Sequence, residues 1–464
     1  MKNLKSTEEF TIVLERNNFA LISVDIRVDP LLFMSNFQIG LIIFFVAFVI
    51  IAMLIFSGFI PVGGKKAKEA AVVSTIEVWG SLKKNTLAPF IGNFNTQNQN
   101  LKINYVEKNA ATFDQELTEA LANGQSPDLF IVSNDNLLTL QRRIAPIPFA
   151  SFPEANFRNT FIAEADMFMT PNGLLALPFV VDPVIMFYNK SLLDGAGVAV
   201  PPKYWDELTT LAPVLTKKDE KFNINQSAAA LGSFSNINNA KDILTTLFVQ
   251  AGNPIFVKAG TIQTPVLDQS FGQTIKPAEA VLRFYTEFSN PAKEAYSWNR
   301  ASLNSKDSFL SQGLVFYFGF ASELLTIQSQ NPNLIIDIRK ILQNRDANVE
   351  ATFGRIYGFT VSNRSKQPVV AFQAVNLLTN QANSLGLAQS IGLPPVRRDM
   401  LAVPPISPYQ LKTFYESAII SRGFADPNPS LTEETFKEMV ESVASNKATI
   451  SQAVSQANQS LGGR

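Results

Sequence analysis

Residues 75–132 read TIEVWGSLKKNTLAPFIGNFNTQNQNLKINYVEKNAATFDQELTEALANGQSPDLFIV, and the period of their apolar pattern changes along the stretch. Residues 75–79 and 101–105 alternate as strands do, whereas residues 87–94 and 113–121 carry apolar side chains at helical spacing. The last four residues are all apolar, which is typical of a strand buried on both faces. The order β-α-β-α-β with short connections predicts a doubly wound parallel sheet of the α/β class.

Polar residues mark the expected helix ends in this stretch. Thr86 is suited to the N-cap of the first helix. Thr112 and Gln115 stand three residues apart, which is the spacing of a capping box for the second helix. Gly124 and Pro127 then predict where the second helix stops.

The C-terminal ends of the predicted strands are rich in hydrogen-bonding groups. Trp79 and Ser81 stand at the end of the first strand, and Asn134 and Asp135 follow the third. In open α/β sheets ligands bind beyond the carboxyl ends of the strands. These four residues are therefore candidate ligand contacts. Trp79 fits a core position equally well, and the other three fit loop caps.

Composition excludes several classes of protein. The chain has 464 residues, which is too long for one hydrophobic core. Its 46% apolar and 17% charged residues exclude general disorder. Lys+Arg and Asp+Glu both number 39, so no basic excess attracts nucleic acid. The chain contains no cysteine and no histidine, which removes thiol, Ser-His-Asp and zinc chemistry. We expect no cofactor and no metal site, and only carboxylate catalysis stays open.

Phe37–Ile60 is an uncharged apolar segment of membrane-spanning length. A helix of that length crosses a hydrocarbon core of about 30 Å, and a buried core helix would seldom be apolar on every face. Orientation is contradictory, because Lys65, Lys66 and Lys68 follow the segment, whereas Arg27 is the one nearby basic residue before it. Those lysines favour a cytoplasmic C-terminal side, although long domains translocate largely regardless of such charges.

Other stretches in the chain predict further strands and helices. Residues 173–189 form a long extended run that contains Asp182 before a proline. Residues 313–319 and 355–361 are apolar enough for strands, and the second is followed by a helix expected over Val369–Gln381. Trp205 opens another helix, and we interpret it as a core anchor.

Five of these segments, in this order, resemble extracellular solute-binding protein family 1, the maltose-binding-protein-like receptors that feed ABC importers. They are LPFVVDPVIMFYNK (177–190), PPKYWDEL (201–208), FLSQGLVFYFGFASE (309–323), RIYGFTV (355–361) with its helix, and GLPPVRRDML (392–401). The resemblance covers about residues 72–461. It departs at the N-terminus, since relatives usually carry a cleaved signal or a lipobox cysteine. Residues 37–60 would replace the lipid anchor.

The resemblance implies a two-lobed, type II periplasmic-binding-protein-like fold, preceded here by one transmembrane helix. The expected organisation is a short cytoplasmic segment (1–36), the transmembrane helix (37–60), a linker (61–71), lobe one (72–181 and 356–394) and lobe two (184–354 and 395–464). The resemblance also implies that the large domain is extracellular or periplasmic, that the lobes close on a ligand, and that ABC permease subunits are partners. We expect a monomer that binds a small solute, with carbohydrate as the family's commonest ligand class.

Sugar sites need hydrogen-bonding groups for hydroxyls and flat aromatic faces for the ring. On the positions that match the family, the candidate contacts beyond the strand ends stand at the lobe crossings and near the cleft. They are Asp182, Trp298, Phe320, Glu323, Tyr357 and Arg397. Each also has a plain structural interpretation as a turn carboxylate, a core aromatic or a solvated charge.

Two other functions stay open beside an importer receptor. A surface sensor of the same fold, without an importer, would use residues 1–36 to signal inward. A carbohydrate-active enzyme would need two carboxylates facing each other across a cleft, and Asp135, Asp182 and Glu323 keep this formally open although no motif supports it. We therefore expect a binding protein and not an enzyme.

Overall fold

The computed structural model describes residues 73–463 except 260, 261 and 348. By internal contacts the chain divides into residues 1–70 and residues 71–464, and only the second unit is described. The expected N-terminal segment, the apolar segment Phe37–Ile60 and the linker 61–71 lie outside the described residues. Within the described part, no helix combines the length and apolarity that a membrane crossing needs.

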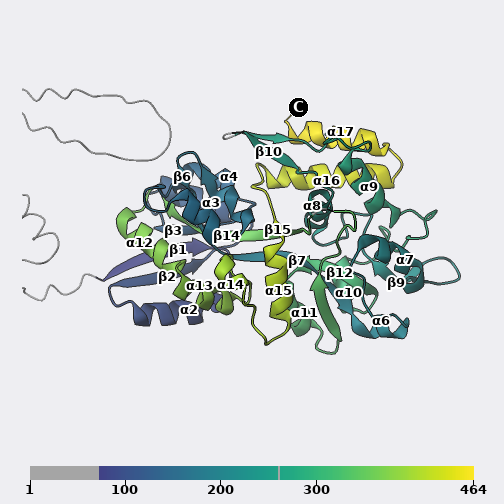
Figure 1. Ribbon diagram of the computed structural model, residues 1–464, viewed down its shortest axis with the longest axis horizontal. Helices are drawn as coiled ribbons and strands as arrows, with labels where there is room; N and C mark the ends of the chain where they lie inside the picture. The colour runs from purple at the N-terminus through teal and green to yellow at the C-terminus, as the bar shows by residue number, and fades with distance from the viewer. Residues whose placement is uncertain (1–72, 260–261, 348, 464) are drawn as a thin grey trace, which may run out of the picture. The chain divides into compact units, whose positions relative to one another are not determined.

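Lobe one is built on the predicted β-α-β-α-β unit (Figure 1). Strands β1 (Ser74–Gly80), β2 (Leu101–Glu107) and β3 (Leu129–Val132) form a parallel sheet with β1 in the middle. The helices α2 (Lys84–Gln97) and α3 (Phe113–Ala122) connect them. The parallel sheet is therefore confirmed, and all four residues of β3 are buried as its apolar composition requires.

Three details of the predicted helices are wrong. Helix α2 begins at Lys84, so Thr86 lies in its first turn and Lys83 is the N-cap. Thr112 does precede α3, but its hydroxyl donates to the Glu116 carboxylate and forms no capping box. The helix expected over Val369–Gln381 is two helices, α12 (Pro368–Leu378) and α13 (Gln381–Ile391), because the Asn380 side chain accepts the Asn383 N–H and starts a new helix.

Two long strands run from lobe one into lobe two. Strand β7 (Leu177–Asn189) is buried along its whole length, and its first half pairs antiparallel with β14 (Thr352–Ser362). The second half of β7 pairs with the lobe-two strands β12 (Leu314–Phe320) and β13 (Ile336–Lys340). Because β7 and β14 belong to both lobes, the strands form one 11-stranded sheet.

A third connection crosses near the C-terminus. The short strand β15 (Ser421–Arg422) runs parallel to β14 and pairs Ser421 with Thr352. Gly354 of β14 has no side chain at this point, and a Cβ there would overlap the Ser421 hydroxyl. The close packing of β15 on β14 therefore requires glycine at position 354.

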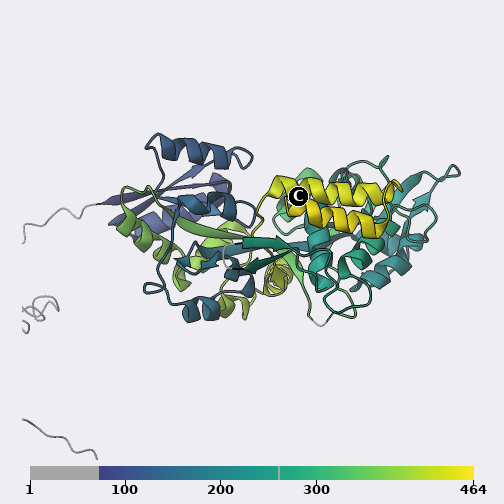
Figure 2. The ribbon, with the colours of Figure 1, turned by 90° about the horizontal axis from the view of Figure 1, so that it is seen from above.

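Lobe two completes the sheet with β9 (Ile224–Ala229) and β8 (Lys217–Lys218), and helices surround it (Figures 1 and 2). Trp205 is buried and donates through Nε1 to Gln250 Oε1 at 2.7 Å, which confirms its interpretation as a core anchor. The lobe-two helices are α6 (Lys190–Gly195), α7 (Trp205–Leu215), α8 (Ala240–Gln250), α9 (Pro277–Glu287), α10 (Ser305–Leu310), α11 (Glu323–Gln330), α16 (Pro429–Ala444) and α17 (Ile450–Leu461).

The remaining elements are short or lie near the crossing. They are α4 (Leu137–Leu140), η1 (Gln141–Arg143), β4 (Ile144–Ala145), α5 (Glu154–Thr160), η2 (Ala163–Phe168), β5 (Met169–Thr170), β6 (Gly173–Leu174), β10 (Phe256–Ala259), β11 (Ile262–Pro265), α14 (Arg398–Leu401) and α15 (Gln410–Ile419). The β10–β11 hairpin extends from lobe two toward β6 of lobe one (Figure 1).

Candidate functional site

The crossing strands bring aromatic and charged side chains together between the lobes. Asp182 of β7 pairs in register with Arg355 of β14. The Arg355 guanidinium lies 4.3 Å from the ring centre of Phe320, at the end of β12. Tyr357 stands two residues along β14 and therefore shares the Arg355 face of that strand. These four residues form the centre of the candidate site.

Ion pairs from both lobes surround this centre. Arg355 Nε lies 3.1 Å from Asp135 Oδ2, just beyond β3 of lobe one. Lys241, in the first turn of α8 in lobe two, reaches the same carboxylate at 3.4 Å and Asp426 at 3.6 Å. Arg355 also approaches Asp242 at 4.0 Å. The Lys241–Asp135 pair thus connects the lobes directly.

We call the group made by Asp135, Asp182, Lys241, Asp242, Phe320, Arg355, Tyr357 and Asp426 the inter-lobe cluster. It contains four carboxylates and two cations, a formal excess of two negative charges. Asp242 Oδ1 and Asp426 Oδ2 are buried without a hydrogen-bond partner among the described residues. Both oxygens lie near a cation but accept no hydrogen bond, and such buried acceptors favour a ligand that supplies hydrogen-bond donors.

The cluster shifts the pKa values of its members in opposite directions. Burial raises the pKa of Asp182 to about 6, although the Ser322 N–H donates to Asp182 Oδ1 at 3.0 Å. Burial likewise raises the pKa of Asp242 to about 6. Burial also opposes ionisation of Asp135, but Arg355 and Lys241 outweigh it and hold the Asp135 pKa below its ordinary value. Asp135 is therefore ionised at neutral pH and holds both cations.

The pKa of Lys241 depends on the carboxylates of the same cluster. Burial would lower the pKa of Lys241, but Asp135, Asp242 and Asp426 raise it above its ordinary value. Burial raises the pKa of Tyr357 to about 12, so its hydroxyl stays protonated and can donate a hydrogen bond. The arrangement offers hydrogen-bond acceptors, hydrogen-bond donors and two aromatic faces, which are the groups that a small-molecule site uses.

Of the residues expected from the sequence, Asp135, Asp182, Phe320 and Tyr357 meet in this cluster. Glu323 lies beside it, where its Oε1 accepts the Phe320 N–H at 2.9 Å and its Oε2 pairs with Lys306 at 2.9 Å. Glu323 is therefore placed to position Phe320.

Asn134 supports the cluster through the backbone. Its side chain accepts the Ile356 N–H at 2.8 Å and donates to the Gly354 carbonyl at 3.0 Å, which continues the β3–β14 pairing beyond the end of β3. Its own carbonyl accepts the Asp426 N–H at 3.0 Å. Asn134 is thus a buried positioning residue between β14 and the segment after β15.

The other four expected residues lie outside the cluster. Trp79 donates to Glu77 at 2.6 Å and has Lys108 3.7 Å above its ring. Ser81 is partly exposed in the loop after β1. Trp298 is 1% exposed and donates to Asn236 at 3.1 Å. Arg397 pairs with Asp399 at 3.2 Å and lies 6.0 Å from the Phe161 ring. Their roles as ligand contacts stay predictions.

The sequence did not single out four members of the cluster, which are Lys241, Asp242, Arg355 and Asp426. Arg355 stands at the start of a quoted strand, and a lone cation among apolar strand residues is a signal that could have marked it. Lys241 and Asp242 open an ordinary helix, where charges usually face solvent, and no local pattern distinguishes them. Within the described residues, no group of acidic side chains is arranged to hold a metal ion.

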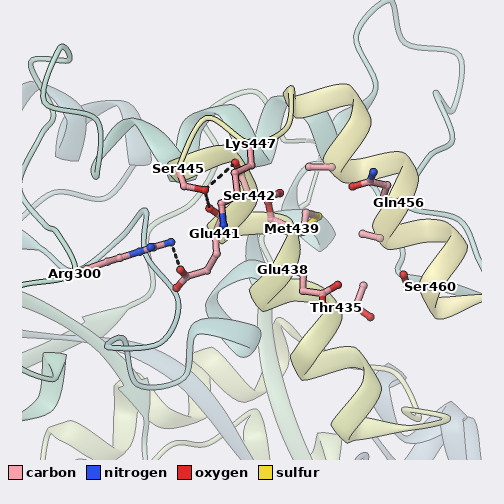
Figure 3. A pocket seen from close by; sticks show the side chains of 12 residues that line it. Arg300, Thr435, Glu438, Met439, Glu441, Ser442, Ser445, Lys447, Gln456 and Ser460 are labelled. Atoms are coloured by element: carbon pink, nitrogen blue, oxygen red, sulfur yellow. Dashed lines mark hydrogen bonds and ion pairs between the residues drawn. The ribbon is translucent and has the colours of Figure 1, made fainter.

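Hollows elsewhere in lobe two involve none of these residues. One of about 390 Å³ lies along α16 and α17, where Glu441 pairs with Arg300 beside Ser442 and Ser445 (Figure 3). Another of about 470 Å³ lies between Trp205 and Phe284. Neither reaches the crossing strands.

A family model described as bacterial extracellular solute-binding protein matches residues 79–384. The chain belongs to this family. Its matched family and structural neighbours are substrate-binding proteins and not enzymes, which confirms the expectation that the chain binds its ligand without transforming it.

Each of two curated relatives aligns with only part of this chain. A binding protein of Brucella abortus is 28% identical over 119 residues, which is 25% of this chain and 28% of the relative. An ABC transporter-binding protein of Deinococcus radiodurans is 32% identical over 73 residues, or 16% of this chain and 17% of the relative. The alignment with each relative thus spans less than a third of that relative's length.

Solved structures match nearly the whole described part. The cyclic alpha-maltosyl-1,6-maltose binding protein of Arthrobacter globiformis is 13% identical, with a TM-score of 0.70 over 84% of this chain and 98% of that one. An ABC substrate-binding protein of Listeria monocytogenes, in complex with cycloalternan, is 16% identical, with a TM-score of 0.64 over 84% and 98%. At such identity the likeness shows the fold alone, and it confirms the two-lobed α/β architecture.

Proposed function

We propose that the protein is a membrane-anchored extracellular receptor that captures a carbohydrate between its lobes and delivers it to an ABC importer. The observation that carries this proposal is the inter-lobe cluster, in which Asp135 of lobe one and Phe320 of lobe two meet around Arg355 of a crossing strand. Such a group is made only when the lobes are together. A ligand bound there would therefore favour the closed arrangement.

The chemistry of the cluster suits a polyhydroxylated ligand. The Asp182 and Asp242 carboxylates can accept hydrogen bonds from hydroxyls, and the Phe320 and Tyr357 rings can cover the apolar side of a sugar ring. Arg355 now lies over the Phe320 ring, where a sugar would stack. A ligand would displace this guanidinium, and the cation could then donate to ligand hydroxyls. Several neighbours of the same fold were solved with carbohydrates, among them maltotetraose and mannotriose.

The proposed hinge consists of β7, β14 and the segment that begins with β15. Lobe one would be residues 72–181 and 356–394, and lobe two would be residues 184–354 and 395–464. The boundaries at 181–184 and 354–356 fall where Asp182 and Arg355 pair across the two strands. Rotation there would separate Asp135 from Lys241 and open the cluster.

The proposed anchor is Phe37–Ile60, with residues 1–36 in the cytoplasm and the large domain outside. A protease added to intact cells should then remove the large domain. Cleavage of the N-terminal piece alone would show that the lysines after the apolar segment set the opposite orientation.

Ligand binding is tested by thermal unfolding of the full-length chain against a carbohydrate panel that includes maltotetraose and mannotriose. A ligand at 100 times its dissociation constant should add about 2.7 kcal/mol to the free energy of unfolding. Asp135→Asn and Asp182→Asn should abolish the stabilisation, whereas the exposed control Asp219→Asn should keep it. A panel without any stabilising sugar, or full stabilisation of both cluster variants, would refute the proposal. Import is tested separately by the loss of uptake of the bound sugar when the chain is deleted.

A further inference from the structure

A cavity between the lobes lies on the face of the crossing strand β14 that is opposite the inter-lobe cluster. Its volume is about 260 Å³. We call it the rear pocket, and its lining includes Glu164, Leu175, Phe256, Lys258, Arg422 and Phe424. Lobe one contributes α4 and η2, lobe two contributes the β10–β11 hairpin, and the third crossing contributes residues 422–425.

The rear pocket is separate from the inter-lobe cluster because β14 lies between them. Arg355 and Tyr357 point to the cluster from one face of β14. A Cβ added to Gly354, on the opposite face, would meet Glu164 Oε2 at 2.9 Å. Glu164, which lines the rear pocket, therefore stands behind the strand that carries Arg355.

Two cations of this pocket have no acidic partner. Lys258 Nζ donates to the Met169 carbonyl at 2.8 Å, and Arg422 donates to the Ser421 carbonyl at 2.7 Å. Within residues 73–463 neither forms an ion pair with a carboxylate. Asp166 lines the same pocket, but Arg158 already pairs with it. The pocket thus presents positive charge that the described protein does not neutralise.

The one other acid in the wall is kept neutral. Glu164 is 4% exposed, its Oε1 accepts from Asn134 at 3.4 Å, and its Oε2 has no hydrogen-bond partner among the described residues. Burial raises the pKa of Glu164 to about 8, against Ser421, Asn134 and Arg422, which lower it. At neutral pH Glu164 therefore leaves Arg422 free for another anion.

The remaining walls are apolar. The Phe256 and Phe424 rings lie 5.5 Å apart and join the β10–β11 hairpin to the segment after β15. Leu175 is buried, and Met167 and Leu138 are partly buried beside it. A pocket with apolar walls and a few convergent polar groups is the usual form of a small-molecule site.

From the two cations without an acidic partner and the apolar walls, we propose that the rear pocket binds a small carboxylic acid with an apolar or aromatic body. The carboxylate pairs with Arg422 and Lys258, and the body packs against Phe256, Phe424 and Leu175. Because both lobes line the pocket, a bound acid stabilises the arrangement in which they stand here. This site is spatially separate from the carbohydrate site, because β14 lies between them.

The test is calorimetric titration of the full-length chain with benzoate and with its neutral isostere benzamide at pH 6.5. Benzoate should bind at least tenfold more tightly than benzamide. Arg422→Gln should weaken benzoate at least tenfold, whereas Arg283→Gln, an exposed arginine on α9, should not change it. No benzoate binding, equal binding of benzamide, or binding insensitive to Arg422→Gln overturns the proposal.

A second arm uses pH. Benzoate stays ionised between pH 6.5 and 9, whereas Glu164 ionises through about 8 and then competes for Arg422. Wild-type affinity should fall over this range more steeply than the affinity of Glu164→Gln, which stays neutral. Burial lowers the pKa of Lys258, and any loss of affinity through Lys258 is common to both proteins. An equal fall in both proteins would show that Glu164 does not face the site and would overturn the assignment.

Discussion

Replacing Lys241 by methionine should destabilise the protein strongly at neutral pH. Lys241 is 9% exposed, and its ammonium group lies 3.4 Å from Asp135 and 3.6 Å from Asp426. At an effective dielectric constant near 20, the attraction across the shorter distance is roughly 5 kcal/mol. Removal of one partner from a buried pair typically costs about 3–5 kcal/mol, because the other charge stays buried. Asp135 retains some solvent, so we expect a loss of about 3 kcal/mol.

The loss should depend on pH in a defined direction. Burial already raises the pKa of Asp426 with Lys241 present, and without Lys241 that pKa rises further. The pKa of Asp135 rises as well, because Arg355 is then its one remaining cation in the cluster. A carboxyl group with a raised folded-state pKa costs stability above that pKa, and the cost disappears as the pH falls and the group takes up a proton. Lys241→Met should therefore cost clearly less stability at pH 5 than at pH 7.

Urea unfolding of the full-length wild-type and variant proteins at both pH values measures this difference. The matched control is Lys83→Met, which breaks an exposed pair with Glu107 of 3.0 Å. That pair is shorter but screened by water, so its removal should leave the free energy of unfolding almost unchanged. Equal losses for Lys83→Met and Lys241→Met, or the same loss for Lys241→Met at pH 5 and pH 7, would refute the assignment of Lys241 as a buried inter-lobe cation.

Three further predictions concern buried positions in other parts of the fold. Asp182→Asn should be more stable than the wild type by about 2 kcal/mol at pH 8 but not at pH 4. The reason is that burial raises the Asp182 pKa to about 6, and ionisation of a buried carboxyl group above that pH costs stability. The same difference in free energy of unfolding at both pH values, measured by denaturant titration, would contradict this. Trp205→Phe should cost about 2 kcal/mol in urea unfolding, since it leaves the buried Gln250 Oε1 without its donor, and no loss would show that water replaces the indole. Gly423→Ala should lower the free energy of unfolding by about 1–3 kcal/mol, because a Cβ at this position would overlap the Asn134 and Glu164 side chains. The control Gly92→Ala lies in a helix where a Cβ meets nothing, and it should raise the free energy of unfolding by about 0.5–1 kcal/mol. A change of the same sign in both variants would refute the packing argument.

The sequence predicted a good part of the candidate site. Asp182 and Tyr357 were found because they stand on strands whose apolar pattern is visible, and the resemblance placed those strands at the lobe crossing. Asp135 was found because the carboxyl end of a buried strand is a general ligand position. Trp298 was expected near a cleft, but it is buried against Asn236, and nothing local in its loop shows which way the indole packs.

The parallel unit of lobe one and the buried crossing strand can be predicted from the amino-acid pattern, because the spacing of apolar residues along strands and helices is a local property of the chain. Which charges meet depends on the fold. Lys241 and Asp135 are 106 residues apart, and each alone resembles a solvated charge. Their pairing, and the burial that shifts their pKa values, arise when β7, β14 and β15 bring the lobes together. Such long-range proximity depends on the whole topology and leaves no mark on neighbouring residues.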